Sequence, residues 1–186
     1  MKEYKPGKPL LISLIILLLL GNATYGQAIK DTAGIAKNTV YVELLGNGGL
    51  YSINYDRILF RIKRLRISAG IGISYIPPSI WYYKHFIFPI GINFIYGGTN
   101  NIEVGLRYNP VLNLYKYDIP TIYNFSFIPE ININYRFQKL KGGFFFKMGL
   151  ILFFDKNEYT TTFSNYSNNN IWLGLGIGYT FKNKRK

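Results

Sequence analysis

The sequence contains no cysteine, one histidine and few acidic residues. Without cysteine there is no disulfide framework, no lipid attached at a cysteine and no thiolate metal site. The single histidine, His85, has no second histidine to share a metal with, so we expect no metal and no cofactor. The 9 acidic residues are outnumbered by 22 lysines and arginines, which gives a net charge of +13. A strongly positive charge is also typical of nucleic-acid-binding proteins.

No apolar run is long enough to cross a bilayer as a helix, which needs about 20 residues. The one candidate, residues 10–20, follows three lysines and precedes several small residues. This pattern predicts a secretory signal peptide at residues 1–26 rather than a retained anchor, with cleavage after Gly26 or after Ala28. Residues 27–38 are predicted to be a flexible periplasmic lead. Export argues against nucleic acid as a partner.

The rest of the chain lacks helical spacing and alternates large apolar residues with small or polar ones. In residues 171–181, IWLGLGIGYTF, the odd-numbered positions are large, and glycine fills most of the other face. A half-buried soluble strand would carry polar residues on its second face, whereas glycine suits a crowded barrel interior. The large face is therefore predicted to meet lipid.

Eight strands are predicted from this alternation. They cover residues 40–45, 51–56, 67–75, 86–94, 102–108, 125–137, 145–154 and 171–181. Pro89 and Pro129 interrupt two of them, and Pro110 is predicted to end the fifth, with a longer loop at residues 111–124. Lipid forbids unpaired sheet edges, so we predict an all-β fold, an eight-stranded antiparallel up-and-down transmembrane barrel at residues 39–181. A barrel of this size is filled by side chains, which predicts no open pore.

The lengths of the connections between strands provide a second indication of a membrane barrel. With a periplasmic amino terminus, short turns are expected after every second strand and longer loops after the others. Six of the seven connections roughly comply. The exception is the connection at residues 46–49, where a long outer loop is expected but the sequence predicts a tight turn. Either this hairpin is short or the register of the first strand is wrong.

Charged residues on the small-residue face are predicted to point into the lumen. They are Glu43, Asp56, Glu103, Arg107, Glu130, Arg136 and Lys147. An isolated buried ion is very costly, so these residues must pair, which favours a structural salt-bridge network. The alternative is a gated ion path or a pair of catalytic carboxylates.

A basic rim is predicted at the periplasmic end. It consists of Arg61, Lys63, Arg64, Arg66, Lys139 and Lys141, with Lys182, Lys184, Arg185 and Lys186 in a basic tail at residues 182–186. Such a rim either binds anionic head groups, at about 1 kcal/mol per nearby charge, or is a solvated rim that stops the barrel from sliding.

Aromatic residues recur near the strand ends and are predicted to form interfacial girdles. They are Tyr51, Tyr55, Tyr75, Tyr96, Tyr108, Tyr135, Tyr179 and Phe181. Further aromatic residues occupy the predicted long loops and are candidates for binding a surface ligand, although a membrane-facing rim explains them equally well. These are Trp81, Tyr82, Tyr83, Tyr115 and Tyr117.

Almost all of the mature chain resembles the small eight-stranded outer-membrane barrels of the OmpA/OmpX type. The phrase VYVELLGNGGLYSINYDR at residues 40–57 looks like Bacteroidetes proteins of this kind, and the last strand resembles a barrel-assembly signal, apart from the KNKRK that follows Phe181. The resemblance implies a structural, adhesive or surface-binding outer-membrane protein that is not an enzyme. Its implied partners are outer-membrane lipids including lipopolysaccharide, the barrel assembly machinery and an unknown surface ligand.

Two other classes of protein stay open. A lipid A-modifying barrel enzyme would need a hydroxyl and a carboxylate near His85, and Ser79 is close in sequence. However, KHFIF does not resemble the histidine–serine motif of lipid A deacylases, so His85 is interpreted as an interfacial residue. A secreted soluble barrel that carries an apolar ligand would instead place the large residues inside.

Overall fold

The computed structural model describes residues 34–77, 84–115, 122–154 and 171–182. The chain divides into two units. The first, Met1–Asp31, includes the predicted signal peptide and lies outside the described ranges, and the second, Thr32–Lys186, contains every described strand. Within the described ranges, no helix is long and apolar enough to cross a membrane.

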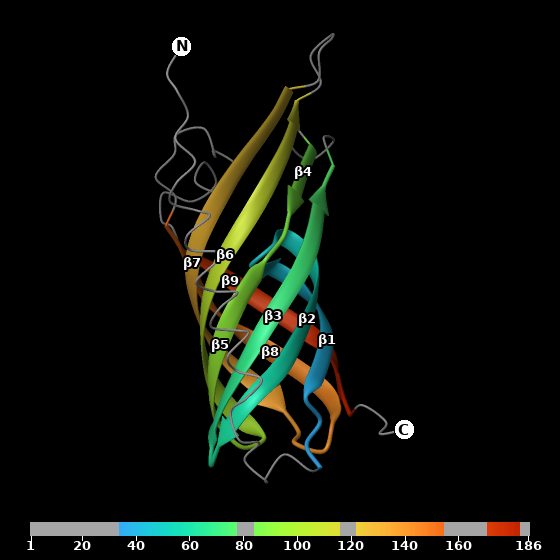
Figure 1. Ribbon diagram of the computed structural model, residues 1–186, viewed down its shortest axis with the longest axis vertical. Helices are drawn as coiled ribbons and strands as arrows, with labels where there is room; N and C mark the ends of the chain where they lie inside the picture. The colour runs from blue at the N-terminus through green and yellow to red at the C-terminus, as the bar shows by residue number, and fades with distance from the viewer. Residues whose placement is uncertain (1–33, 78–83, 116–121, 155–170, 183–186) are drawn as a thin grey trace, which may run out of the picture. The chain divides into compact units, whose positions relative to one another are not determined.

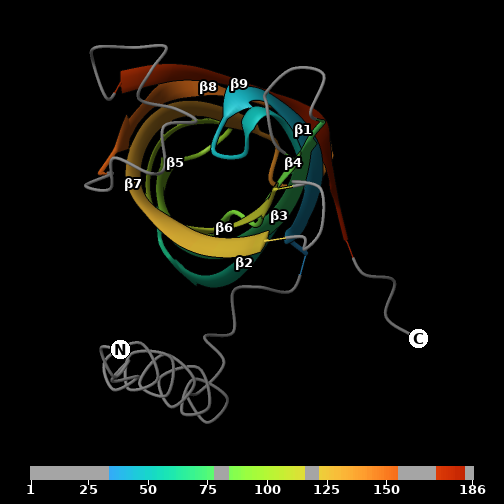
Figure 2. The same cartoon turned by 90° about the horizontal axis from the view of Figure 1, so that it is seen from above.

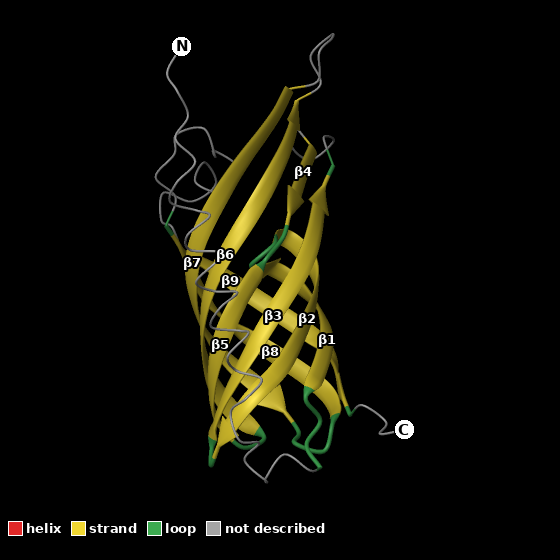
Figure 3. Ribbon diagram, viewed as in Figure 1, coloured by secondary structure: helices red, strands yellow, loops and turns green. Residues whose placement is uncertain are grey.

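The described residues form antiparallel strands that wind around a common axis (Figures 1 and 3). They are β1 (Asn38–Gly46), β2 (Gly49–Ile62), β3 (Leu65–Ile76), β4 (Lys84–Ile87), β5 (Ile90–Gly97), β6 (Asn100–Tyr115), β7 (Ile122–Gln138), β8 (Gly143–Phe153) and β9 (Ile171–Phe181).

The sheet closes on itself, as Figure 2 shows from above. β1 pairs with β9, with Val42 opposite Ile177, and β2 pairs with β3, so none of the described strands keeps a free edge. β4 and β5 follow one another along the same gap between β3 and β6 and together form one wall. The fold is thus the predicted closed eight-stranded antiparallel barrel.

Prolines explain the break between β4 and β5. Pro89 has no N–H to donate to the ladder, and its carbonyl accepts from the Gly72 N–H at 2.7 Å. On the other side of the break, the Phe88 N–H donates to the Pro110 carbonyl at 2.9 Å. Pro89 and Pro110, on neighbouring strands, therefore lie at the same interruption of the hydrogen-bond ladder, and Pro110 does not end β6. The predicted loop at 111–124 is wrong in extent, because β6 continues to Tyr115 and β7 begins at Ile122.

The two faces of the barrel follow the predicted alternation. On β1, Val42 is 49% exposed on the outer face and Glu43 is 1% exposed on the inner face. The same division holds along β9, where Leu175 and Ile177 lie outside and the glycines lie inside. In the described strands most large apolar residues therefore lie outside, which is the reverse of the arrangement expected of a soluble carrier.

The two ends of the barrel differ. One end, here called the short-turn end, carries the start of β1, the end of β9 and the turns at residues 63–64, 98–99 and 139–142. The other, the long-loop end, carries the connections after β3, β6 and β8 and the short hairpin between β1 and β2. The tight turn at residues 46–49 is therefore a genuine short hairpin in the predicted register, since Leu44 pairs with Tyr51.

Candidate functional site

Arg136 of β7 joins three walls across the lumen. Its Nη2 lies 2.8 Å from Oδ1 of Asp56 on β2, and its Nη1 lies 2.6 Å from Oε2 of Glu103 on β6. All three side chains are buried. Asp56 also accepts hydrogen bonds from Ser68 at 2.7 Å and from Asn93 at 2.8 Å. Glu103 accepts a further hydrogen bond from the Asn134 amide at 3.0 Å, so both carboxylates keep a charged partner and additional donors, which burial of an ion requires.

A second ion pair links β8 to β1, the strand that meets β9 at the seam where the barrel closes. Lys147 Nζ lies 2.6 Å from Glu43 Oε1 and 4.8 Å from the centre of the Tyr41 ring. A third and looser pair has Arg107 Nε 3.8 Å from Glu130 Oε1, while Asn109 donates to the other Glu130 oxygen at 2.7 Å. The structure thus places all seven predicted lumen residues in ion pairs.

Arg66 belongs to the lumen and not to the basic rim. It is 1% exposed and donates hydrogen bonds to Asn101 Oδ1 and to the Gly98 carbonyl. The signal was present in the sequence, because Arg66 has the same parity as the inward-facing Ser68. With Arg66 included, buried cations and buried carboxylates are equal in number among the described residues. The cations are Arg66, Arg107, Arg136 and Lys147, and the carboxylates are Glu43, Asp56, Glu103 and Glu130.

The β1–β2 hairpin folds into the barrel, as Figure 2 shows, instead of extending outward as a loop. At its tip Asn47 is 1% exposed, and its backbone N–H and side-chain amide donate to the Glu43 carboxylate at 3.1 and 2.9 Å. From the opposite wall, Asn132 on β7 donates to Asn47 Oδ1 at 3.2 Å. Glu43 therefore ties the hairpin to Lys147, and Asn132 ties it to the far wall. We call this element the hairpin plug, residues 46–49.

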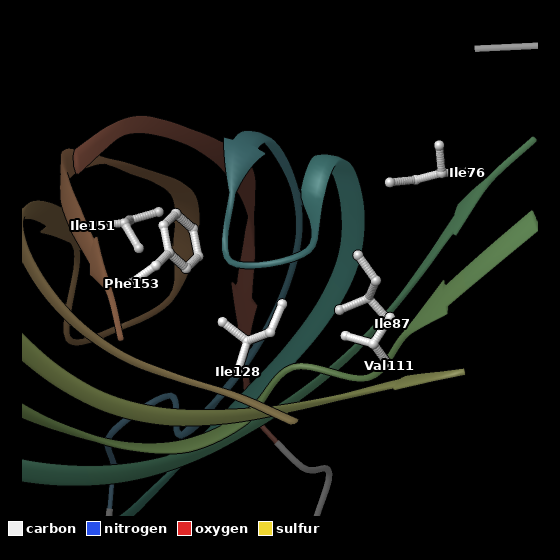
Figure 4. Close-up of a cluster of buried hydrophobic side chains, with 6 residues drawn as sticks. All are labelled: Ile76, Ile87, Val111, Ile128, Ile151 and Phe153. Atoms are coloured by element: carbon white, nitrogen blue, oxygen red, sulfur yellow. The ribbon is translucent and has the colours of Figure 1, made fainter. Parts of the chain in front are cut away.

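An apolar layer lines the inner face toward the long-loop end. Figure 4 shows its side chains, which come from five strands and pack with Leu50 of the β1–β2 hairpin and with Trp172 of β9. They are Ile76, Ile87, Val111, Ile128, Ile151 and Phe153. Because the hairpin carries Leu50 inward, part of the lumen is packed as an ordinary hydrophobic core. Sequence reasoning did not identify this layer, since it treated most of the inner face as polar.

His85 of β4 is buried and faces inward, so its interpretation as an interfacial residue is wrong. Its Nδ1 is hydrogen-bonded to Asn113 Oδ1, and the Asn113 amide donates to Ser126 Oγ at 3.4 Å. The described carboxylates are engaged in the ion pairs above, and Ser79 lies outside the described residues. In the described part of the chain, no group of three or more His, Cys, Asp and Glu side chains is arranged to hold a metal ion.

The aromatic residues named as girdles lie on the outer face at different heights along the strands. Tyr51 and Tyr75 lie nearer the long-loop end, Tyr96, Tyr135, Tyr179 and Phe181 nearer the short-turn end, and Tyr55 and Tyr108 near the middle of their strands. Two of the hydroxyls bind asparagines near the short-turn end, Tyr55 to Asn38 at 2.7 Å and Tyr135 to Asn100 at 2.8 Å.

Most of the candidate ligand-binding aromatics lie outside the described residues. Tyr115 ends β6, whereas Trp81, Tyr82, Tyr83 and Tyr117 fall in the gaps of the described ranges. Of the basic rim, Arg61, Lys63, Arg64, Lys139, Lys141 and Lys182 lie at the short-turn end, and Lys184, Arg185 and Lys186 are not described.

A closed eight-stranded barrel with an apolar outer face and an ion-paired lumen defines the fold class of the small outer-membrane barrels. No protein-family model and no curated protein matches the sequence. Among solved structures, the barrel is similar to the N-terminal β-barrel domain of Pseudomonas aeruginosa OprF. The TM-score is 0.51 at 10% identity, over 78% of this chain and 96% of that one. Neisserial surface protein A (NspA) also matches, with a TM-score of 0.44 at 15% identity over 78% of this chain and 93% of that one.

Proposed function

We propose that the chain is an integral protein of the bacterial outer membrane, with a structural or surface-binding role and a lumen closed by its own side chains. The observation that carries this proposal is the inverted distribution of polarity. Large apolar side chains such as Leu173, 66% exposed, cover the outside, whereas charged residues are paired inside. An aqueous protein would gain by reversing these faces, so the arrangement fits a barrel surrounded by lipid.

The closed lumen rests on the contacts across it. Arg136 reaches from β7 to β2, and the hairpin plug reaches from β1 and β2 to Asn132 on β7. Ions would have to displace paired charges and the Asn47 hydrogen bonds in order to pass. This supports a filled barrel rather than a pore.

Cell fractionation with gel migration tests the proposal. We expect the full-length chain in the outer-membrane fraction, and we expect unheated protein to migrate differently from boiled protein in detergent gels, as a closed barrel does until heat unfolds it. Recovery in the soluble periplasmic fraction, with no difference between unheated and boiled samples, would contradict an integral membrane barrel.

The lipid A-modifying enzyme remains the second candidate because His85 has an orienting hydrogen bond from its Nδ1 to Asn113. Mass spectra of lipid A from cells that express the wild type and His85→Ala separate the two candidates. A structural role predicts identical lipid A in both. A modified lipid A that disappears in His85→Ala would favour the enzyme.

A further inference from the structure

Among the described residues, the lumen carries charges of both signs, whereas the surface carries only positive ones. All described carboxylates are buried in the lumen, where they pair with buried cations. Every described charged side chain that is not buried is cationic: Lys37, Arg57, Arg61, Lys63, Arg64, Lys84, Lys139, Lys141 and Lys182. Among the described residues, the charges of the lumen are therefore balanced, and the positive excess lies on the surface without a described carboxylate beside it.

The described surface cations gather at one end of the barrel. Lys84 alone among them lies at the long-loop end. The turn between β2 and β3 carries Lys63 and Arg64, the turn between β7 and β8 carries Lys139 and Lys141, and Lys37 and Lys182 flank the seam. Because the sheet order runs β2-β1-β9-β8-β7, these positions form one continuous arc. The turn between β5 and β6, at residues 98–99, carries no charge.

The arc borders the apolar outer face directly. Ile62, Phe144 and Tyr179 lie along it and are 56%, 53% and 60% exposed. Arg57 stands on the outer face of β2 itself, opposite Asn38 of β1 and Ala69 of β3. An arginine among lipid-facing residues extends its charge toward the head groups while its stem stays in the apolar region. In a bilayer, the charges of the arc and of Arg57 would then meet the head groups of the same leaflet.

We propose that this arc, together with Arg57, is a binding surface for anionic phospholipids of the surrounding leaflet, whose phosphodiesters pair with the arginines and lysines. The inference rests on the proposed function, because it requires lipid around the barrel. A rim that only prevented sliding would need no excess of one sign. An anionic polymer in the aqueous space, such as peptidoglycan, could reach the turns but not Arg57 on the outer face of the strand.

The expected preference is measurable. The attraction of one basic side chain to an anionic surface corresponds to about a fivefold preference, and several cations engage at once. Because the contacts lie at the membrane surface, salt screens them. Anionic lipid should therefore be enriched around the barrel by about fivefold or more over a zwitterionic lipid, and less so at high salt.

The test uses the folded full-length barrel in nanodiscs that contain equal amounts of phosphatidylglycerol and phosphatidylethanolamine. Co-elution with the discs and a heat-dependent gel shift first establish that the barrel has inserted. Native mass spectrometry after mild detergent release then counts the retained lipids. A chain that does not insert overturns the proposed function and this inference with it. An inserted barrel that retains both lipids equally overturns this inference alone.

Substitutions locate the surface. The variant Arg57→Gln, Arg64→Gln, Lys139→Gln, Lys141→Gln should lose most of the phosphatidylglycerol enrichment, and Lys84→Gln at the opposite end should keep it. None of these side chains takes part in a lumen ion pair, so the gel shift should persist in both variants. The single variant Arg57→Gln should also weaken the preference. Enrichment that is unchanged in the fourfold variant would overturn the assignment, as would peptidoglycan binding that does not depend on Arg57.

Discussion

Arg136 is the residue on which two buried carboxylates depend. Replacing it with methionine keeps much of the side-chain volume but leaves Asp56 and Glu103 without their nearest cation. Removing one partner of a buried ion pair costs about 3–5 kcal/mol, because the remaining charge is left uncompensated. We expect Arg136→Met to lower the free energy of unfolding by about this amount, measured by urea unfolding in lipid bilayers. Lys84→Met is the control, since Lys84 is exposed, and it should change stability by less than about 0.5 kcal/mol.

Gly178 allows the backbones of β9 and β1 to approach where the barrel closes. A Cβ at this position would lie 2.6 Å from the Tyr41 Cα, so an alanine must push the two seam strands apart. Overpacking of this kind costs about 1–3 kcal/mol, and we expect Gly178→Ala to lower the temperature at which the unheated gel band disappears.

Gly98 provides the matched control for the seam substitution. A Cβ there meets nothing within 4 Å, so Gly98→Ala should leave the transition temperature unchanged. Equal transitions for the two alanine variants would show that the seam tolerates a side chain and that the glycines of β9 have another role.

At the scale of elements, the hairpin plug decides whether the lumen conducts. Asn47 holds the plug through Glu43 on its own hairpin and through Asn132 on the opposite wall. Asn47→Ala removes the side-chain hydrogen bonds to Glu43 and Asn132 but leaves the backbone N–H bond to Glu43 and the ion pair of Glu43 with Lys147 in place. We expect the wild type to be silent in planar bilayers and Asn47→Ala to show brief openings. Thr99→Ala, in a turn at the other end, should stay silent. Large, stable wild-type channels would contradict a plugged lumen.

The sequence predicted the walls of the barrel better than its interruptions. Alternation identified the inner and outer faces, because a strand buried on one side and in lipid on the other must separate residue types with period two. The predicted end of β6 at Pro110 was wrong. Proline is excluded from a regular hydrogen-bond ladder, but it is tolerated here because it lies opposite the break next to Pro89. The length of the 46–49 turn was evident, whereas its inward fold depends on Asn132, which is 85 residues away from Asn47 in the chain.

The same limit applies to the candidate site. Parity along a strand predicted that Glu43, Glu103 and Arg136 face inward, but pairing between distant strands decides which charge meets which. Arg136 and Asp56 are 80 residues apart in the sequence, and only closure of the sheet brings them together. Arg66 was assigned to the rim because it belongs to a run of basic residues, although its own parity indicates the lumen.

At the scale of the whole molecule, the medium around the barrel can be distinguished by substitutions at different depths on one strand. Leu175 and Phe181 both point outward from β9 and are almost equally exposed, at 37% and 38%. Leu175 lies in the middle of the wall, opposite Leu44 of β1 and Met148 of β8, whereas Phe181 ends the strand at the short-turn end. In water, arginine at either position would have a similar small effect, because the two sites are equally accessible.

In a bilayer the two substitutions differ, because the cost of a charge depends on its depth. Arginine on the lipid face costs about 2–4 kcal/mol at the midplane and about 0–1 kcal/mol near the interface. We expect Leu175→Arg to destabilise the barrel by the larger amount and Phe181→Arg by the smaller, measured by urea unfolding in phosphatidylcholine vesicles. The apolar variants Leu175→Ala and Phe181→Ala correct for lost packing. Equal costs for the two arginines would mean that the exposed apolar belt does not lie in hydrocarbon, whereas a graded cost places the middle of β9 at the centre of a membrane.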